Sequence, residues 1–275
     1  MATFPAMRLP LVHKLTYTWD GWPSQAGPPL PAEPDFSAID PLWLGDGLRR
    51  MNSRWTHSLA QLSFEAEPSI SPVLFTTRVK GRLDHALRKA GTPATFSRKV
   101  GMRAIGDNTD PVVARYLELQ QVRGEFADQK YRRTLEEFSR EYPEIDLEAP
   151  AETLSGRYWY NLHLVAVTND RWRMGRGDYL PKLTAAVPAW AEECGHALRA
   201  MALMPDHVHV IVRGNPQQSP CEIAESLYRA LNRAAGLRLF SDRLYAGTFS
   251  SYAREAIGLH DLRGELVAAG RSSIP

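Results

Sequence analysis

The chain contains an internal repeat, and this repeat limits the folds that it can adopt. Two Ser-Pro pairs, Ser71-Pro72 and Ser219-Pro220, lie 148 residues apart, and each precedes a segment with helical periodicity. Further along, Phe96-Ser97 matches Phe240-Ser241 at a spacing of 144 residues, so the second copy is four residues shorter there. Self-similarity at a nearly constant spacing is typical of a duplicated domain. The 275 residues therefore predict two similar units of roughly 120 residues each, joined in tandem.

Both copies predict strands mixed with helices. In the first copy we expect strands over 11–19, 59–64 and 96–105, and helices over 40–59 and 72–90. In the second copy we expect strands over 158–168, 198–204, 207–213 and about 244–249, and helices over 179–194, 220–235 and 253–269. Strands interspersed with helices in this way predict an α+β protein.

The composition indicates the cellular compartment in which we expect the protein. The chain has two cysteines, Cys194 and Cys221, which are too few for a disulfide framework and favour a reducing cytoplasm. No apolar run reaches the roughly 18 residues that a membrane span needs, and the first residues lack the pattern of a signal peptide. We therefore expect a soluble cytoplasmic protein with no membrane partner.

The formal net charge of +2 conceals two segments of opposite charge. Eight basic residues lie between positions 78 and 103 with one acidic residue, and such a density is typical of a phosphate-binding face. These basic residues are Arg78, Lys80, Arg82, Arg88, Lys89, Arg98, Lys99 and Arg103. A solvated helix face is the alternative interpretation. Between 136 and 152, seven acidic residues accompany one base, which predicts an acidic helix and an extended connector between the copies.

The most informative segment is MPDHVHVIV, residues 204–212. Side chains alternate between the two faces of a strand, so His207 and His209 point the same way while Val208 and Val210 face the opposite side. Two imidazoles at this spacing can share one divalent metal ion. Taken alone, a His-x-His pair is more often structural. Asp206 is placed to orient one of the histidines, although turn chemistry also accounts for a Pro-Asp pair here.

The segment MPDHVHVIV closely resembles the histidine-hydrophobe-histidine signature of the single-tyrosine HUH transposases, of the IS200/IS605 type and their REP-associated relatives. The resemblance implies ferredoxin-like (RRM-like) domains, with antiparallel sheets covered by helices. It also implies Mg²⁺ or Mn²⁺ on the two histidines, and a tyrosine on a late helix that attacks single-stranded DNA to form a 5′-phosphotyrosine. A glutamine one turn after the tyrosine completes the metal site in that family.

Each copy lacks what the other retains. The expected last helix of the second copy contains no tyrosine, and His260 falls at the corresponding position. The first copy has no His-x-His, but it resembles the family's Tyr-x-x-x-Gln helix at Tyr116 and Gln120. Residues four apart share one face of a helix, so Tyr116 can reach the phosphorus while Gln120 reaches the metal.

This complementarity predicts a pseudo-dimer with one composite active site. The resemblance implies that a tyrosine helix can complete the site of a partner protomer, so we expect Tyr116 and Gln120 to meet His207 and His209. We expect a degenerate transposase-like domain over 1–126, an acidic helix and connector over 127–155, and a histidine-bearing domain over 156–275. The expected partner is single-stranded or hairpin DNA, and further oligomerisation is left open.

Two alternatives remain at this stage. The chain can be a DNA-binding protein that has lost catalysis, as the missing tyrosine of one copy and the missing histidines of the other would suggest. It can also be a metal hydrolase that activates water at the two histidines and forms no protein-linked product.

Overall fold

The structure is a computed structural model, which describes residues 11–25, 27–106, 129–175 and 178–250, with the backbone alone for 129–132, 260–261 and 265–266. The described residues form two six-stranded sheets. The first sheet has the order β3 (Leu48–Trp55), β4 (Ala60–Ala66), β2 (Thr16–Gly21), β5 (Val100–Ile105), β8 (Gly156–Trp159), β7 (Ala151–Glu152). The second has the order β10 (Ala197–Leu203), β11 (His207–Arg213), β9 (Asn161–Thr168), β12 (Phe240–Thr248), β1 (Leu11–Lys14), with β6 (Arg140–Glu141) outside β10.

The two sheets share one strand order and one irregularity. The order β3-β4-β2-β5-β8 corresponds element by element to β10-β11-β9-β12-β1. Each first strand carries a bulge, at Met51 in β3 and at Arg199 in β10, and these two residues are again 148 positions apart. The expected α+β architecture with two sheets is therefore confirmed.

The two copies exchange a strand. β1 pairs in parallel with β12 of the second sheet, and β8 pairs in parallel with β5 of the first, whereas the other pairs are antiparallel. The chain crosses between sheets at Leu15 and at Tyr160. The carbonyl of Leu15 accepts from Ala66 N at 3.1 Å, and that of Tyr160 accepts from Gly214 N at 2.7 Å. Strands expected as continuous over 11–19 and 158–168 are thus each divided between two sheets.

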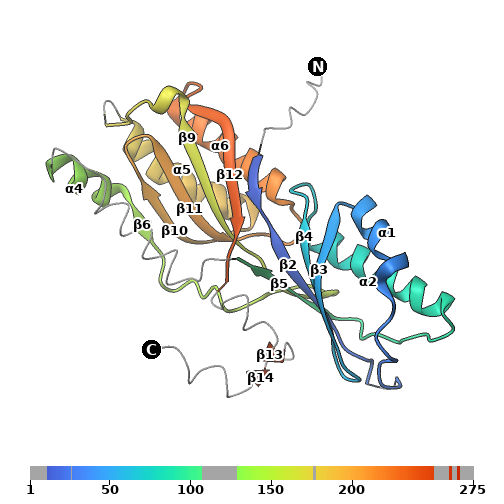
Figure 1. Cartoon of the computed structure of the whole chain (residues 1–275). Coiled ribbons are helices and arrows are strands. Elements are labelled where there is room, and N and C mark those ends of the chain that lie inside the picture. Colours follow the sequence, from blue (N-terminus) through green and yellow to red (C-terminus); the bar gives the residue numbers. More distant parts are fainter. Residues whose placement is uncertain are drawn as a thin grey trace, which may run out of the picture.

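Helices cover one face of each sheet (Figure 1). α2 (Pro72–Lys89) begins at Ser71, whose hydroxyl accepts from Leu74 N, and α6 (Pro220–Ala235) begins with a capping box between Ser219 and Glu222. α5 (Tyr179–Cys194) packs beside α6 on the second sheet. These three helices confirm the sequence predictions. No helix among the described residues is long and apolar enough to cross a membrane.

The helix starts also contact each other reciprocally. Val73 N donates to Pro216 O at 3.2 Å, and Cys221 N donates to Pro68 O at 2.9 Å. The two donor residues are 148 positions apart in the sequence, and so are the two acceptor residues. Such an exchange of equivalent contacts is the pattern of an isologous interface. The larger hydrophobic cluster of the described residues runs through both copies, with the rings of Tyr17 and Tyr160 6.2 Å apart between centroids.

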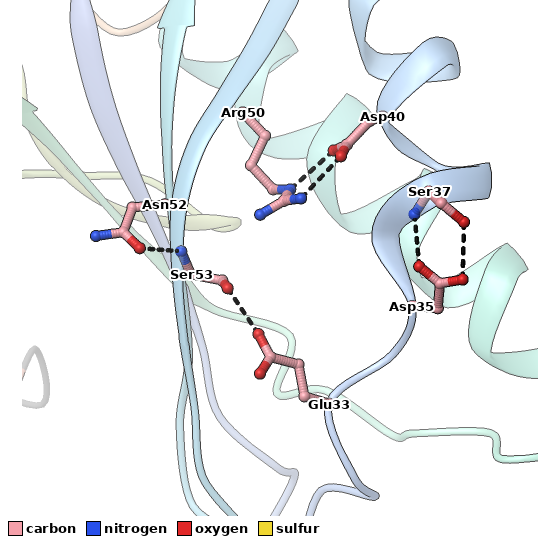
Figure 2. Close-up of polar contacts among 7 residues, drawn as sticks. All are labelled: Glu33, Asp35, Ser37, Asp40, Arg50, Asn52 and Ser53. Carbon is pink, nitrogen blue, oxygen red and sulfur yellow. Dashed lines mark hydrogen bonds and ion pairs between the residues drawn. The ribbon is translucent and has the colours of Figure 1, made fainter.

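The helix expected over 40–59 is wrong beyond its first turns. α1 (Asp40–Gly45) is followed by Gly47, whose φ of 80° favours glycine, and the chain continues as strand β3. Figure 2 shows how this strand is tied to the preceding segment. Arg50 donates to both carboxylate oxygens of Asp40 at 2.8 and 2.7 Å, and Ser53 donates to Glu33 at 2.6 Å. The 3-10 helix η1 (Phe36–Ala38) lies between these partners.

One other expectation needs correction. The helix expected over 253–269 does not form at its described residues, which pair as β13 (His260–Asp261) and β14 (Glu265–Leu266). The acidic segment is helical in α4 (Gln129–Phe138), and the connector after it contains two short strands. β6 pairs with β10, and β7 with β8. The boundaries at 126 and 156 stay predictions, and β1 and β8 each pair with a strand of the other expected domain.

Candidate metal centre

The two motif histidines lie side by side on β11. Their ring centroids are 4.8 Å apart, and His209 is 3% exposed while the side chain of His207 is 17% exposed. Val208 and Val210 between and after them are fully buried in the core on the face that α5 and α6 cover. The histidines therefore occupy the opposite face of the second sheet, as strand alternation requires.

Asp206 orients His207. Its Oδ1 lies 2.7 Å from Nδ1 of His207, so a neutral imidazole donates its Nδ1–H to the carboxylate and presents the lone pair of Nε2. The other oxygen, Oδ2, accepts from Arg171 at 3.3 Å. Asp206 thus contacts one of the two motif histidines.

His163 contacts His209, and it is not among the site residues that the sequence predicts. It lies on β9, the strand next to β11, and its Nε2 is 2.9 Å from Nδ1 of His209. The two rings stack at 5.1 Å with an interplanar angle of 18°, and Tyr245 of β12 meets the ring of His163 edge-on at 6.0 Å. An Nδ1–H of His209 donated to His163 leaves Nε2 as the coordinating nitrogen, as in His207.

The electrostatics keep the imidazoles of His163 and His209 neutral. Burial, together with the smaller effects of the neighbouring His163 and His207, lowers the pKa of His209 to about 2. Burial also lowers the pKa of His163 to about 4. At neutral pH both rings therefore have a lone pair, which a metal ligand requires.

A divalent metal fits this pair, but the described residues do not complete its coordination. They contain no group of three or more His, Cys, Asp or Glu side chains that could hold a metal ion. The expected further ligand Gln120 and the expected nucleophile Tyr116 lie outside the described residues. Metal binding by His207 and His209 therefore stays a prediction, and so does the contribution of Gln120.

The corresponding place in the first sheet has different chemistry. By the shared register, His207 and His209 of β11 correspond to Leu59 and Gln61 at the start of β4. Gln61 Nε2 donates to Oδ1 of the fully buried Asp20 at 2.7 Å. Burial raises the pKa of Asp20 to about 7, against the opposing effect of that hydrogen bond. The first sheet therefore has no imidazole pair at this position.

The basic segment is less available than its charge suggests. Arg82 donates to both carboxylate oxygens of Asp46 at 2.8 and 3.0 Å, and Arg78 donates to Asp46 O at 2.5 Å. Lys80 donates to Ser97 O, and Arg103 lies over the ring of Trp159 with 4.3 Å between its guanidinium carbon and the centroid. The remaining four residues are exposed, and they are Arg88, Lys89, Arg98 and Lys99. Their DNA contact stays a prediction.

The acidic connector packs against the histidine-bearing face. Leu147 contacts the apolar cluster that contains Ile211, two residues beyond His209 on the same face of β11. Arg213 donates to the carbonyls of Asp146 and Ala149, both at 2.7 Å, and Asn161 donates to that of Leu147 at 3.1 Å. The connector therefore forms part of the surroundings of the site.

The comparisons with known proteins concern the same region. Residues 157–242 match the family described as "Transposase IS200 like", and this span begins in β8, ends in β12 and includes both histidines. No curated protein matches the chain.

Two solved structures are similar over most of the chain, but weakly. The ligand-free regulatory subunit of aspartate kinase from Thermus thermophilus is 10% identical, with 80% of this chain and 92% of that one covered, at a TM-score of 0.20. The corresponding subunit from Thermus flavus is 15% identical, with 81% and 94% covered, at a TM-score of 0.18.

Proposed function

We propose that the chain is a metal-dependent single-stranded DNA endonuclease and strand transferase of the IS200-like transposase type. The observation that carries this proposal is the histidine pair within the family match. His207 and His209 lie together on one strand, and each has its Nδ1 engaged by a neighbouring side chain so that Nε2 can coordinate. Paired ligands with fixed tautomers are typical of a metal centre.

The proposed chemistry is a transesterification at phosphorus. Oη of Tyr116 gives up its proton to solvent and attacks the scissile phosphate. The new O–P bond forms, the P–O3′ bond breaks, and the leaving oxygen takes a proton from solvent to become a 3′-hydroxyl. The 5′-phosphotyrosine conserves the bond energy, so attack by another 3′-hydroxyl rejoins the strand. When bound, Mg²⁺ or Mn²⁺ polarises the phosphate. Gln120 is proposed as its further ligand.

We propose that the active site is composite, with Tyr116 and Gln120 from the first copy and the histidines from the second. The reciprocal contacts of Val73 and Cys221 support a pseudo-dimeric arrangement of the two copies. The exchange of β1 and β8 supports it too, because each sheet is completed by a strand of the other copy. Leu59 and Gln61 in the corresponding place of the first sheet support a single metal site for each chain.

The test is capture of the covalent intermediate. The full chain is incubated with a library of single-stranded hairpin oligonucleotides labelled at the 3′ end and Mn²⁺, and the products are separated on a denaturing gel. We expect the label to travel with the protein, and Tyr116→Phe to abolish this adduct. Tyr245→Phe is the matched control, because Tyr245 is a described tyrosine on the histidine face. An adduct that survives in Tyr116→Phe would refute the nucleophile.

A second candidate function is DNA binding without catalysis. The observation that favours it is the absence, among the described residues, of a group of three His, Cys, Asp or Glu side chains that could hold a metal. Binding of hairpin DNA without any adduct would support this candidate. Cleavage without a protein-linked product would support hydrolysis by metal-activated water instead.

A further inference from the structure

The turn that follows β9 has an unfavourable backbone. It begins with the 3-10 helix η2 (Asn169–Arg171), in which Asp170 has φ 50° and ψ 28°. Arg171 has φ 55°, so two consecutive residues other than glycine occupy the left-handed region. Residues with a Cβ avoid this region, and such conformations persist where the surroundings enforce them and often where function uses them.

Hydrogen bonds fix the turn at both ends. Asn169 N donates to Leu239 O at 2.8 Å, and Thr168 Oγ1 lies 2.7 Å from Trp172 O and 2.9 Å from Asp206 O. Met174 N donates to the carbonyl of Pro205 at 2.7 Å. The turn is therefore held against the Pro205-Asp206 corner, directly before the histidine pair.

The fixed turn presents two cations and an indole to solvent. The side chain of Arg171 is 67% exposed, Trp172 is 40% exposed, and Arg173 is also exposed. The indole of Trp172 meets the ring of Tyr179 edge-on at 5.4 Å between centroids, which holds one side of it and sets its orientation. Arg171 contacts Asp206, and Asp206 contacts His207. The exposed group thus lies two contacts from His207, a proposed metal ligand.

We propose that Arg171, Trp172 and Arg173 bind an unpaired nucleotide beside the scissile phosphate of a DNA single strand. This inference rests on the proposed function. Guanidinium groups neutralise backbone phosphates, and an exposed indole stacks on a base whatever its sequence. A turn that is already fixed loses little conformational freedom when the strand binds.

A purely structural role for Arg171 is the competing explanation, and its ion pair argues against it. The contact with Asp206 is long, at 3.3 Å, and exposed, so it contributes little to stability. Arg229 on α6 has an equivalent pair with Glu225 at 3.3 Å and is 63% exposed. Because α6 covers the opposite face of the second sheet, Arg229 is a matched control that should not contact DNA.

The experiment measures binding of the full chain to a dye-labelled single strand by fluorescence anisotropy in EDTA, which prevents cleavage. Arg171→Gly removes the guanidinium and tolerates the positive φ, while Asp170→Gly relaxes the same backbone and leaves the guanidinium in place. We expect Trp172→Ala to weaken binding about tenfold and Trp172→Phe to restore most of it. We expect Arg171→Gly to reduce the slope of log K against log salt by about 0.7, the value for one phosphate of a single strand.

The outcomes separate this inference from the proposed function. Suppose that the wild type binds the single strand, and that Arg171→Gly and Trp172→Ala bind it as tightly as the controls Asp170→Gly and Arg229→Ala. The turn then does not contact DNA, and the inference is wrong. The proposed function is still tested independently by the covalent adduct. A weaker Arg171→Gly with an unchanged salt slope would also overturn the phosphate contact. A wild type that binds no single strand would refute the inference and the proposed function together.

Discussion

Thr248 joins the two copies through one hydroxyl group. This last residue of β12 accepts from Thr16 N at 3.0 Å, and its Oγ1 lies 2.6 Å from Ile105 O and 3.3 Å from Lys14 O. Thr248 and Thr16 are 7% and 6% exposed, so water cannot readily replace these hydrogen bonds. The substitution Thr248→Val keeps the shape of the side chain and removes only the polar contacts.

We expect Thr248→Val to destabilise the protein by about 2 to 4 kcal/mol. A buried N–H left without an acceptor costs about 1 to 3 kcal/mol, and the lost hydrogen bond to Ile105 O adds about 1 kcal/mol. At about 2.1 cal/mol/K per residue, a cooperative chain of 275 residues has an unfolding entropy of about 0.6 kcal/mol/K. The melting temperature should then fall by about 3 to 7 °C.

The assay is urea denaturation followed by circular dichroism, with thermal melting in parallel. Thr248→Ser is the control, because it keeps the hydroxyl and loses a single methyl group, and it should stay within about 1 kcal/mol of the wild type. If Thr248→Val lies within about 0.5 kcal/mol of the wild type, the hydroxyl does not hold the copies together and the reasoning fails.

Two further predictions concern buried polar groups. His163→Phe removes the partner of His209 Nδ1, so Mn²⁺ affinity measured by calorimetry should fall about 10- to 100-fold, and an unchanged affinity would contradict the orienting role. For Asp20, the folded protein retains a proton that the unfolded chain has lost, so stability should fall as pH rises from about 4 to about 7. The free energy of unfolding should fall by up to about 1.4 kcal/mol per pH unit in this range, and this dependence should vanish in Asp20→Asn. If urea unfolding gives the same pH dependence for the wild type and Asp20→Asn, the raised pKa of Asp20 is refuted.

Local features of the sequence were sufficient for the helix starts and for one hairpin. Ser71 and Ser219 cap their helices through their own next residues, and β10 and β11 meet at the Pro205-Asp206 turn. The exchange of β1 and β8 could not be predicted in this way. A strand pattern is continuous over 11–19, and only partners far along the chain decide that Leu11 pairs with Leu244 while Thr16 pairs with Ile105.

The candidate site was also predictable only where local sequence determines it. Strand alternation was sufficient to place His207 and His209 on one face, but the contact of His163 depends on the register between β9 and β11. The prediction for the basic segment was incomplete for a different reason, because a count of charged residues does not reveal which of them have partners. Arg82 pairs with Asp46, a residue that precedes the segment. A sequence therefore indicates the charge of a surface more reliably than its availability.

The strand exchange has a consequence for synthesis on the ribosome. β1 leaves the exit tunnel early, but its partner β12 is not complete until residue 248 has been added. At about 5 to 20 residues per second, β1 waits roughly 10 to 50 s without a neighbour. A chain that terminates before β12 keeps this strand unpaired, and unpaired strand edges promote aggregation. Chains made from truncated copies of the gene should therefore be removed by quality control. They should not accumulate in a folded form.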